Sequence, residues 1–189
     1  AEEYSEKKDQ KLADYHRDMA AKAAPAMADR LWKELASEEH AKVQKGLPWL
    51  SSYPDLKEDV EMLTLGLAVA QGRDLGPAKE RLQQLADNPR LKTSALTLLG
   101  EAQRRLGYYS LAREAFGQVL ASKPEDAPAH WGLQNVCRDT GSFAELEATA
   151  LKGAELNTND LRPNRALCEW HQRKKNSTRA IATVHNTSR

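Results

Sequence analysis

The side chains best suited to chemistry in this 189-residue sequence are its two cysteines and five histidines. Cys168 and His171 lie one helical turn apart, and Cys137 falls on a neighbouring predicted helix, so these three side chains could converge on a metal ion. The other histidines are scattered along the chain. Both cysteines are also typical small core residues, and helix axes packed ~8–10 Å apart rarely bring two cysteines into disulfide geometry. We therefore expect Cys137 and Cys168 to fill the core, and we predict no metal site.

Sequence motifs that indicate catalysis are missing from the chain. It contains no glycine-rich phosphate loop and no dinucleotide fingerprint, and it has no nucleophile elbow. Its many acidic residues fall at positions typical of solvent-facing helix surfaces. We therefore predict that the protein is not an enzyme and that it needs no cofactor.

The composition indicates a polar, helix-rich chain whose positive charge gathers at one end. Hydrophobic residues make up 40% of it, charged residues 29%, and the mean hydropathy is −0.71. No apolar run approaches the ~18 residues that a membrane span requires, so we predict no transmembrane segment. The net charge of +1 hides an asymmetry, because residues 161–189 hold seven Lys/Arg against one acidic residue, while the rest of the chain is net acidic. An electrostatic role is therefore expected mainly in this C-terminal segment.

A shift of the sequence by 34 residues brings residues of the same type into register. Leu65, Leu99 and Leu133 fall in one column, and Gly107 aligns with Gly141. A helical repeat of this length is typical of stacked helical hairpins. The windows that the shift defines are 59–92, 93–126 and 127–160.

The middle window predicts two helices joined by a turn. The first helix is expected to end at Gly107, as a C-terminal glycine cap does. The second begins near Ser110 and ends before Pro124, and its apolar stripe includes Leu111 and Phe116.

This middle window resembles a tetratricopeptide repeat. The resemblance rests on Leu99-Gly100 in the first helix, on Ala112 and Phe116 in the second, and on Pro124 at the exit. The first window matches less fully, and the third is degenerate. The resemblance implies an all-α fold, a right-handed superhelical solenoid of helical hairpins in which neighbouring repeats share a core.

The N-terminal segment 1–58 is expected to form a helical arm or a degenerate repeat. Its pattern predicts helices over 2–23 and 26–44, separated at Pro25, followed by a loop in which Trp49 and Leu50 are buried. A narrow apolar stripe on a charged helix suits packing either on the repeats or on a partner chain.

At the other end, residues 161–175 have the apolar spacing of a capping helix, which an end repeat needs to cover its exposed face. Residues 176–189 are rich in polar side chains and predict a flexible basic tail.

In the family that the middle window resembles, the first helices of successive repeats line a concave groove that holds an extended peptide or a partner helix. The resemblance implies that arginines in this groove pair with an acidic partner segment and that Trp131 is an aromatic anchor. The residues placed in the groove by this resemblance are Leu63, Leu67, Thr97, Glu101, Arg104, Arg105, Trp131, Asn135, Arg138 and Asp139.

These observations favour a non-catalytic adaptor or scaffold that binds a protein partner and supports the assembly of a larger complex. One alternative is a chaperone of a secretion or assembly pathway, which the same resemblance also suggests. A second is contact with nucleic acid or an anionic surface through the basic tail. The residues expected to make that contact are Arg173, Lys174, Lys175 and Arg179. The compartment stays open between the cytoplasm and export after removal of a targeting peptide.

Overall fold

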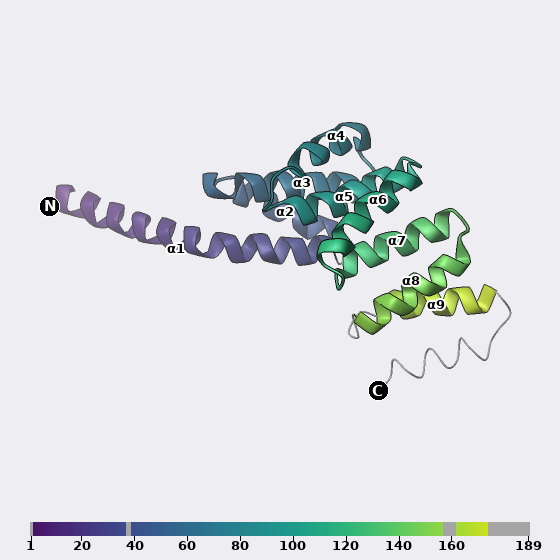
Figure 1. Cartoon of the computed structure of the whole chain (residues 1–189). Coiled ribbons are helices and arrows are strands. Elements are labelled where there is room, and N and C mark those ends of the chain that lie inside the picture. Colours follow the sequence, from purple (N-terminus) through teal and green to yellow (C-terminus); the bar gives the residue numbers. More distant parts are fainter. Residues whose placement is uncertain (1, 37–38, 157–161, 174–189) are drawn as a thin grey trace. The chain divides into compact units, whose positions relative to one another are not determined.

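The computed structural model describes residues 2–36, 39–156 and 162–173, and Figure 1 shows their helices in chain order. Within those ranges, nine α-helices and one short 3-10 helix make up the regular structure, which confirms the predicted all-α class. The contacts divide the chain into two compact units, Ala1–Gln71 and Gly72–Arg189. None of the helices in the described ranges is long and apolar enough to cross a bilayer.

The first unit contains α1 (Glu2–Ala36), α2 (His40–Leu50), the 3-10 helix η1 (Pro54–Leu56) and α3 (Lys57–Gln71). Helix α1 continues through Pro25, so the predicted break into two helices is wrong. The alanines around this proline are strong helix formers. In addition, Ala24 and Ala28 on either side of it are buried, so tertiary packing holds this stretch of the helix in place.

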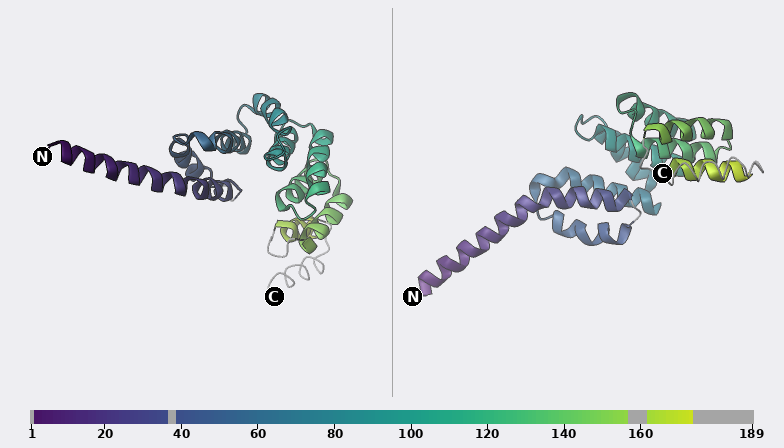
Figure 2. Two further views of the ribbon diagram at one scale, coloured as in Figure 1. Left: turned by 60° about the vertical axis from the view of Figure 1, so that its left-hand side comes forward. Right: turned by 90° about the horizontal axis from the view of Figure 1, so that it is seen from below.

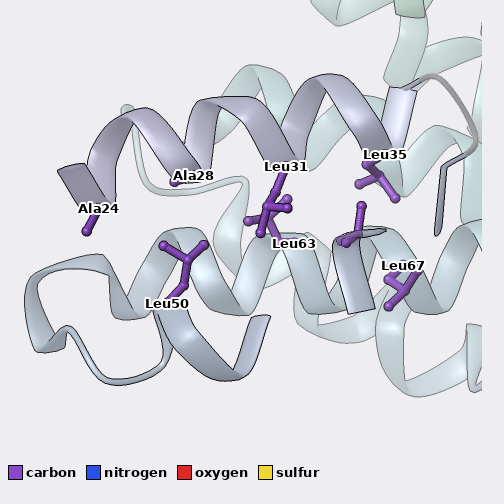
Figure 3. Packing of buried hydrophobic residues seen from close by; sticks show 8 residues of the cluster. Ala24, Ala28, Leu31, Leu35, Leu50, Leu63 and Leu67 are labelled. Carbon is purple, nitrogen blue, oxygen red and sulfur yellow. The ribbon is translucent and has the colours of Figure 1, made fainter. Parts of the chain in front are cut away.

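The core of the first unit lies between α1 and the pair α2 and α3. Ala24, Ala28, Leu31 and Leu35 recur every three or four residues and so form one apolar stripe on α1. Figure 3 shows these side chains facing those of α2 and α3. The residues that they meet there are Val43, Leu50, Leu63 and Leu67.

Helix α2 extends past the point where the sequence predicts a loop. A Cβ at Gly46 would lie 2.7 Å from Leu31 Cδ1, so this glycine allows α2 to pass close to α1. Leu50 is buried as predicted, but Trp49 is 38% exposed. The Trp49 ring instead lies at the surface against Tyr53, with 4.9 Å between the ring centroids.

The N-terminal half of α1 extends beyond the other helices of its unit (Figure 2). Tyr15 and Met19 on this half are 58% and 49% exposed. The predicted arm therefore has two parts: its C-terminal half packs on α2 and α3, and its N-terminal half leaves these apolar side chains at the surface.

The second unit contains α4 (Leu75–Leu85), α5 (Lys92–Arg105), α6 (Tyr109–Ser122), α7 (Ala127–Asp139), α8 (Phe143–Leu156) and α9 (Arg162–Arg173). Each helix packs against the next one along the chain, and α5, α7 and α9 also contact one another in turn. Alternate helices therefore form a row, as in stacked hairpins. Helix α9 occupies the segment predicted as a capping helix.

The turn that closes α5 recurs at the end of α7. Gly107 and Gly141 have φ values of 81° and 69°, and the amides that follow them, Tyr108 and Ser142, each bond to a carbonyl five residues earlier at 2.8 Å. This is the Schellman arrangement that a C-terminal glycine permits. The predicted helix end at Gly107 is confirmed.

Phe116 of α6 is 1% exposed and lies between two glycines on the neighbouring helices. A Cβ at Gly100 of α5 would meet its ring at 2.8 Å, and one at Gly132 of α7 would come closer still. Leu111, predicted in the same stripe, is instead 47% exposed, because it lies on the solvent side of α6.

The boundary between the compact units differs from the predicted start of the repeats at residue 59. Helix α3, the first helix of the predicted window 59–92, packs on α1 and α2, whereas α4 packs on α5. The chain divides after Gln71 because the apolar stripe of α3 is already covered by α1. The repeat windows themselves stay predictions.

Candidate functional site

Two of the ten predicted groove residues lie in the core of the first unit. Leu63 is 0% and Leu67 is 8% exposed, and both pack in one cluster with Leu31 and Leu35 of α1. The C-terminal half of α1 therefore covers the surface on which a partner was expected. These two leucines are core residues and do not line an open groove.

The other eight predicted residues lie on α5 and α7, on alternate helices of the row in the second unit. Each is partly buried or exposed, so a partner can reach the surface that they form. We call this set the α5–α7 face. Its members are Thr97, Glu101, Arg104, Arg105, Trp131, Asn135, Arg138 and Asp139.

Arg104 joins the two helices of this face. Its Nε and Nη2 atoms donate to the two carboxylate oxygens of Glu101, each at 2.8 Å, and its Nη1 forms an ion pair with Asp139 of α7. A guanidinium that binds one carboxylate through two parallel bonds is held in a fixed orientation. Arg104 therefore acts first as an internal bridge from α5 to α7.

Arg105 shares the same carboxylate. Its Nε donates to Glu101 Oε1 at 2.7 Å, and its side chain is 35% exposed. Burial of Glu101 opposes its ionisation, but the hydrogen bonds and charges of Arg104, and then those of Arg105, outweigh burial and lower the pKa of Glu101 below its ordinary value. Glu101 is therefore a charged centre that two arginines share.

Arg138 extends the network from α7 to α9. Its Nη1 donates to Asn135 Oδ1 at 2.6 Å, and its Nη2 lies 3.5 Å from Glu169 of α9. The same guanidinium lies 5.3 Å from the centre of the Trp131 ring, within cation–π range. Arg165 also reaches Glu169, at 3.3 Å.

Glu169 was not among the predicted residues, although the sequence contains a signal for it. It lies 34 residues after Asn135, which itself lies 34 residues after Glu101. The column of polar residues therefore continues into α9, one helix beyond the last predicted repeat. With Glu169 included, the three arginines of the face meet three carboxylates, so their formal charges balance.

A second group of polar contacts, also not predicted, ties α6 to the α7–α8 turn. Arg113 of α6 donates to the hydroxyl of Thr140 at 3.3 Å and to that of Ser142 at 3.4 Å, and it pairs with Glu145. Its guanidinium also lies 3.9 Å from Cys137 Sγ. These contacts join helices across the row, because Arg113 and the turn come from consecutive hairpins.

The two cysteines are free thiols, with Cys137 buried and Cys168 partly buried. Burial raises the pKa of the Cys137 thiol, and Glu145 adds to this rise while Arg113 opposes it. Burial likewise raises the pKa of Cys168. In the described ranges, no three His, Cys, Asp or Glu side chains gather as a metal site would require. Cys137 packs with Leu146 and Leu167, as a core residue does.

The predicted tail contact lies largely beyond the described residues. Lys174, Lys175 and Arg179 fall outside them, and Arg173 is described only as the last residue of α9. The tail contact therefore stays a prediction.

Comparison with known proteins identifies the fold. No family model matches the sequence, and no curated protein matches it. The solved structure of MamA AMB-1 aligns with a TM-score of 0.52 at 15% identity over 86% of this chain and 95% of that one. MamA MSR-1 aligns with a TM-score of 0.53 at 17% identity over 92% of this chain and 93% of that one. The described helices thus pack in sequential hairpins similar to those of MamA, a tetratricopeptide-repeat protein, as the middle window of the sequence predicted.

Proposed function

We propose that this protein is a non-catalytic scaffold that binds a protein partner on the α5–α7 face and supports assembly of a larger complex. The observation that carries the proposal is the Arg104 bridge, which fixes polar side chains of two successive hairpins into one surface. Side chains that are held in place before binding lose less entropy when a partner arrives. The MamA-like fold supports a role in protein–protein interaction.

The charge balance of this face also bears on the partner. The sequence predicted an acidic segment as the ligand of Arg104, Arg105 and Arg138. Because all three already contact Glu101, Asn135, Asp139 or Glu169, a carboxylate of the partner competes with internal acceptors. We therefore propose a peptide or helix that carries both signs of charge, so that it pairs with the carboxylates of the face as well as with its arginines.

The test begins with the partner, identified by its co-purification with the full chain and by its mass. Binding of the purified partner is then measured for Arg105→Ala and Trp131→Ala, with Lys152→Ala on the exposed side of α8 as the matched control. Interface arginine and tryptophan side chains commonly carry much of the binding energy. We expect about a tenfold or larger rise in Kd for both variants and no change for the control. Equal Kd values in all four proteins, with folding retained by circular dichroism, would refute the proposed surface.

A further inference from the structure

The third helical hairpin, α7 with α8, encloses polar atoms that have no hydrogen-bond partner in the protein. Gln134 is 0% exposed, and neither its Oε1 nor its Nε2 is paired. One turn earlier, His130 is 3% exposed, and its Nδ1 is also unpaired. Buried polar atoms in native proteins are almost always paired, either with protein groups or with ordered water.

The hydrogen bond that His130 does make fixes its tautomer. Its Nε2 lies 2.7 Å from the carbonyl oxygen of Pro124, which can only accept. In the neutral ring the proton is therefore on Nε2, and Nδ1 is an acceptor that lacks a donor. Gln134 adds one more unpaired acceptor and one unpaired donor on the same side of α7.

The packing next to Gln134 leaves a niche at Gly153 of α8. The point where a Cβ of residue 153 would stand lies 3.2 Å from Gln134 Nε2, 3.4 Å from Pro163 Cγ and 3.6 Å from His130 Cβ. A separation of 3.2 Å is close for a carbon atom but lies within the range of an N–H···O hydrogen bond. An oxygen atom fits this niche better than a methyl group does.

The preceding hairpin shows where the space comes from. Thirty-four residues before Ala150 and Gly153 stand Phe116 and Val119, both buried. The third hairpin has lost this aromatic ring and this branched side chain, and has gained Gln134 in place of a glycine. Small spaces with polar walls are where proteins hold internal water.

We propose that the junction of α7, α8 and α9 binds one ordered water molecule in the niche at Gly153. The water oxygen accepts a hydrogen bond from Gln134 Nε2. Its hydrogens are then available to the unpaired acceptors of the same face, Gln134 Oε1 and His130 Nδ1. This explains why a glutamine stands in a position that apolar packing disfavours, because the amide and the water satisfy each other.

The direct test measures magnetisation transfer from water to the side-chain amide of Gln134 by NMR on the full chain. Laboratory-frame and rotating-frame experiments together separate dipolar transfer from proton exchange. We expect a dipolar cross-peak between water and the Gln134 NH₂ group. A resolved NH₂ signal without this cross-peak would overturn the proposal.

Two variants locate the water. In Gly153→Ala the new methyl group occupies the niche, so the cross-peak should vanish and Tm should fall by about 2–4 °C. The matched control is Gly117→Ala in α6, where a Cβ meets nothing within 4 Å; it should keep the cross-peak and should not lower Tm. Persistence of the cross-peak in Gly153→Ala would show that the water lies elsewhere.

A third variant tests whether the amide is satisfied. Gln134→Met removes the amide and the need for water together, and replacing both members of a polar pair by an apolar group is nearly neutral. We expect Tm within about 2 °C of the parent protein. A much larger rise in Tm would mean that the glutamine is buried dry, and would contradict the proposed water.

Discussion

At the scale of single residues, Phe116 determines which residues its neighbours can be. Its ring fills the space between α5 and α7, where Gly100 and Gly132 leave no side chain. The small residues that align at the 34-residue shift therefore include contacts with one buried ring. The same reasoning explains why the third hairpin, which has Ala150 in the position of Phe116, tolerates Gln134 in the position of Gly100.

We predict that Gly132→Ala destabilises the protein, although alanine is the better helix former. Its methyl group would overlap the Phe116 ring, and overpacking of this kind costs about 1–3 kcal/mol. Thermal or urea unfolding measures the loss. Combining the change with Phe116→Leu should recover part of the stability, because the two sites share one space. A double variant that is simply the sum of the two single losses would argue against the contact.

Glu101 gives a prediction about pH. Because its pKa in the folded protein is depressed, its pairing with Arg104 and Arg105 stabilises the fold above the ordinary pKa of about 4.5, and this contribution is lost as the pH falls through the folded value. Glu101→Gln should therefore lower the free energy of unfolding by about 1–3 kcal/mol at neutral pH. The difference from the parent protein should shrink toward about pH 3.

Urea unfolding at several pH values measures this difference. Glu114→Gln on the exposed side of α6 is the control, and surface changes of this kind stay within about 0.5 kcal/mol. If the gap between Glu101→Gln and the parent protein is constant with pH, the shared carboxylate does not stabilise the fold as described.

At the scale of elements, the helices of the second unit are shaped at their ends and tied across their row. The Schellman turns at Gly107 and Gly141 close α5 and α7 in the same way. The Arg104–Asp139 pair then links α5 to α7, and Arg138 links α7 to α9. Each hairpin is therefore oriented both by its own turn and by polar bridges to the next hairpin.

The turn predicts a difference between two glycine substitutions. Gly107→Ala forces alanine to adopt a φ of 81°, which is costly for a residue with a Cβ, and should lower stability by about 1 kcal/mol. Gly76→Ala in α4 has open space around its Cβ and no positive φ. It should be neutral or stabilising by about 0.4–1 kcal/mol. Equal unfolding midpoints for the two variants would contradict the role of the left-handed turn.

At the scale of the whole molecule, each compact unit has a hydrophobic cluster of its own. The first unit packs α1 on α2 and α3 through Leu31, Leu50 and Leu63, among others. The second has its own buried side chains, including Phe116 and Val136. Stability is therefore expected to vary between the units, since protection from exchange follows local cores.

We predict that Leu63→Ala loosens the first unit selectively. Removing a fully buried leucine side chain costs about 2–5 kcal/mol. Hydrogen exchange should then accelerate in the C-terminal half of α1, in α2 and in α3, while α5 to α8 keep their protection. Val136→Ala on α7 should show the reverse pattern. If either variant accelerates exchange uniformly along the chain, the two units unfold together.

Much of the fold could be predicted from local patterns in the sequence. The leucine column of Leu65, Leu99 and Leu133, together with Gly107, indicates helical hairpins, because helix spacing and a left-handed turn depend on neighbouring residues only. The same locality explains the errors. Pro25 is a strong local break signal, yet burial of the alanines beside it carries α1 through.

The candidate site could be predicted only in part. Its eight residues on α5 and α7 follow from the repeat register, and so, by one further shift, does Glu169. The pairing of Arg104 with Glu101 and Asp139 does not follow, because it depends on how two helices pack and on which side-chain rotamers meet.

By itself, then, the sequence determined the helical class, the hairpin unit and the polar composition of the α5–α7 face, since all three arise from contacts within a few turns of chain. The tertiary structure alone decided that α1 covers Leu63 and Leu67, that the arginines are paired internally and that Gln134 is buried without a partner. These features depend on which surfaces meet across distant parts of the chain, and no local pattern encodes that choice.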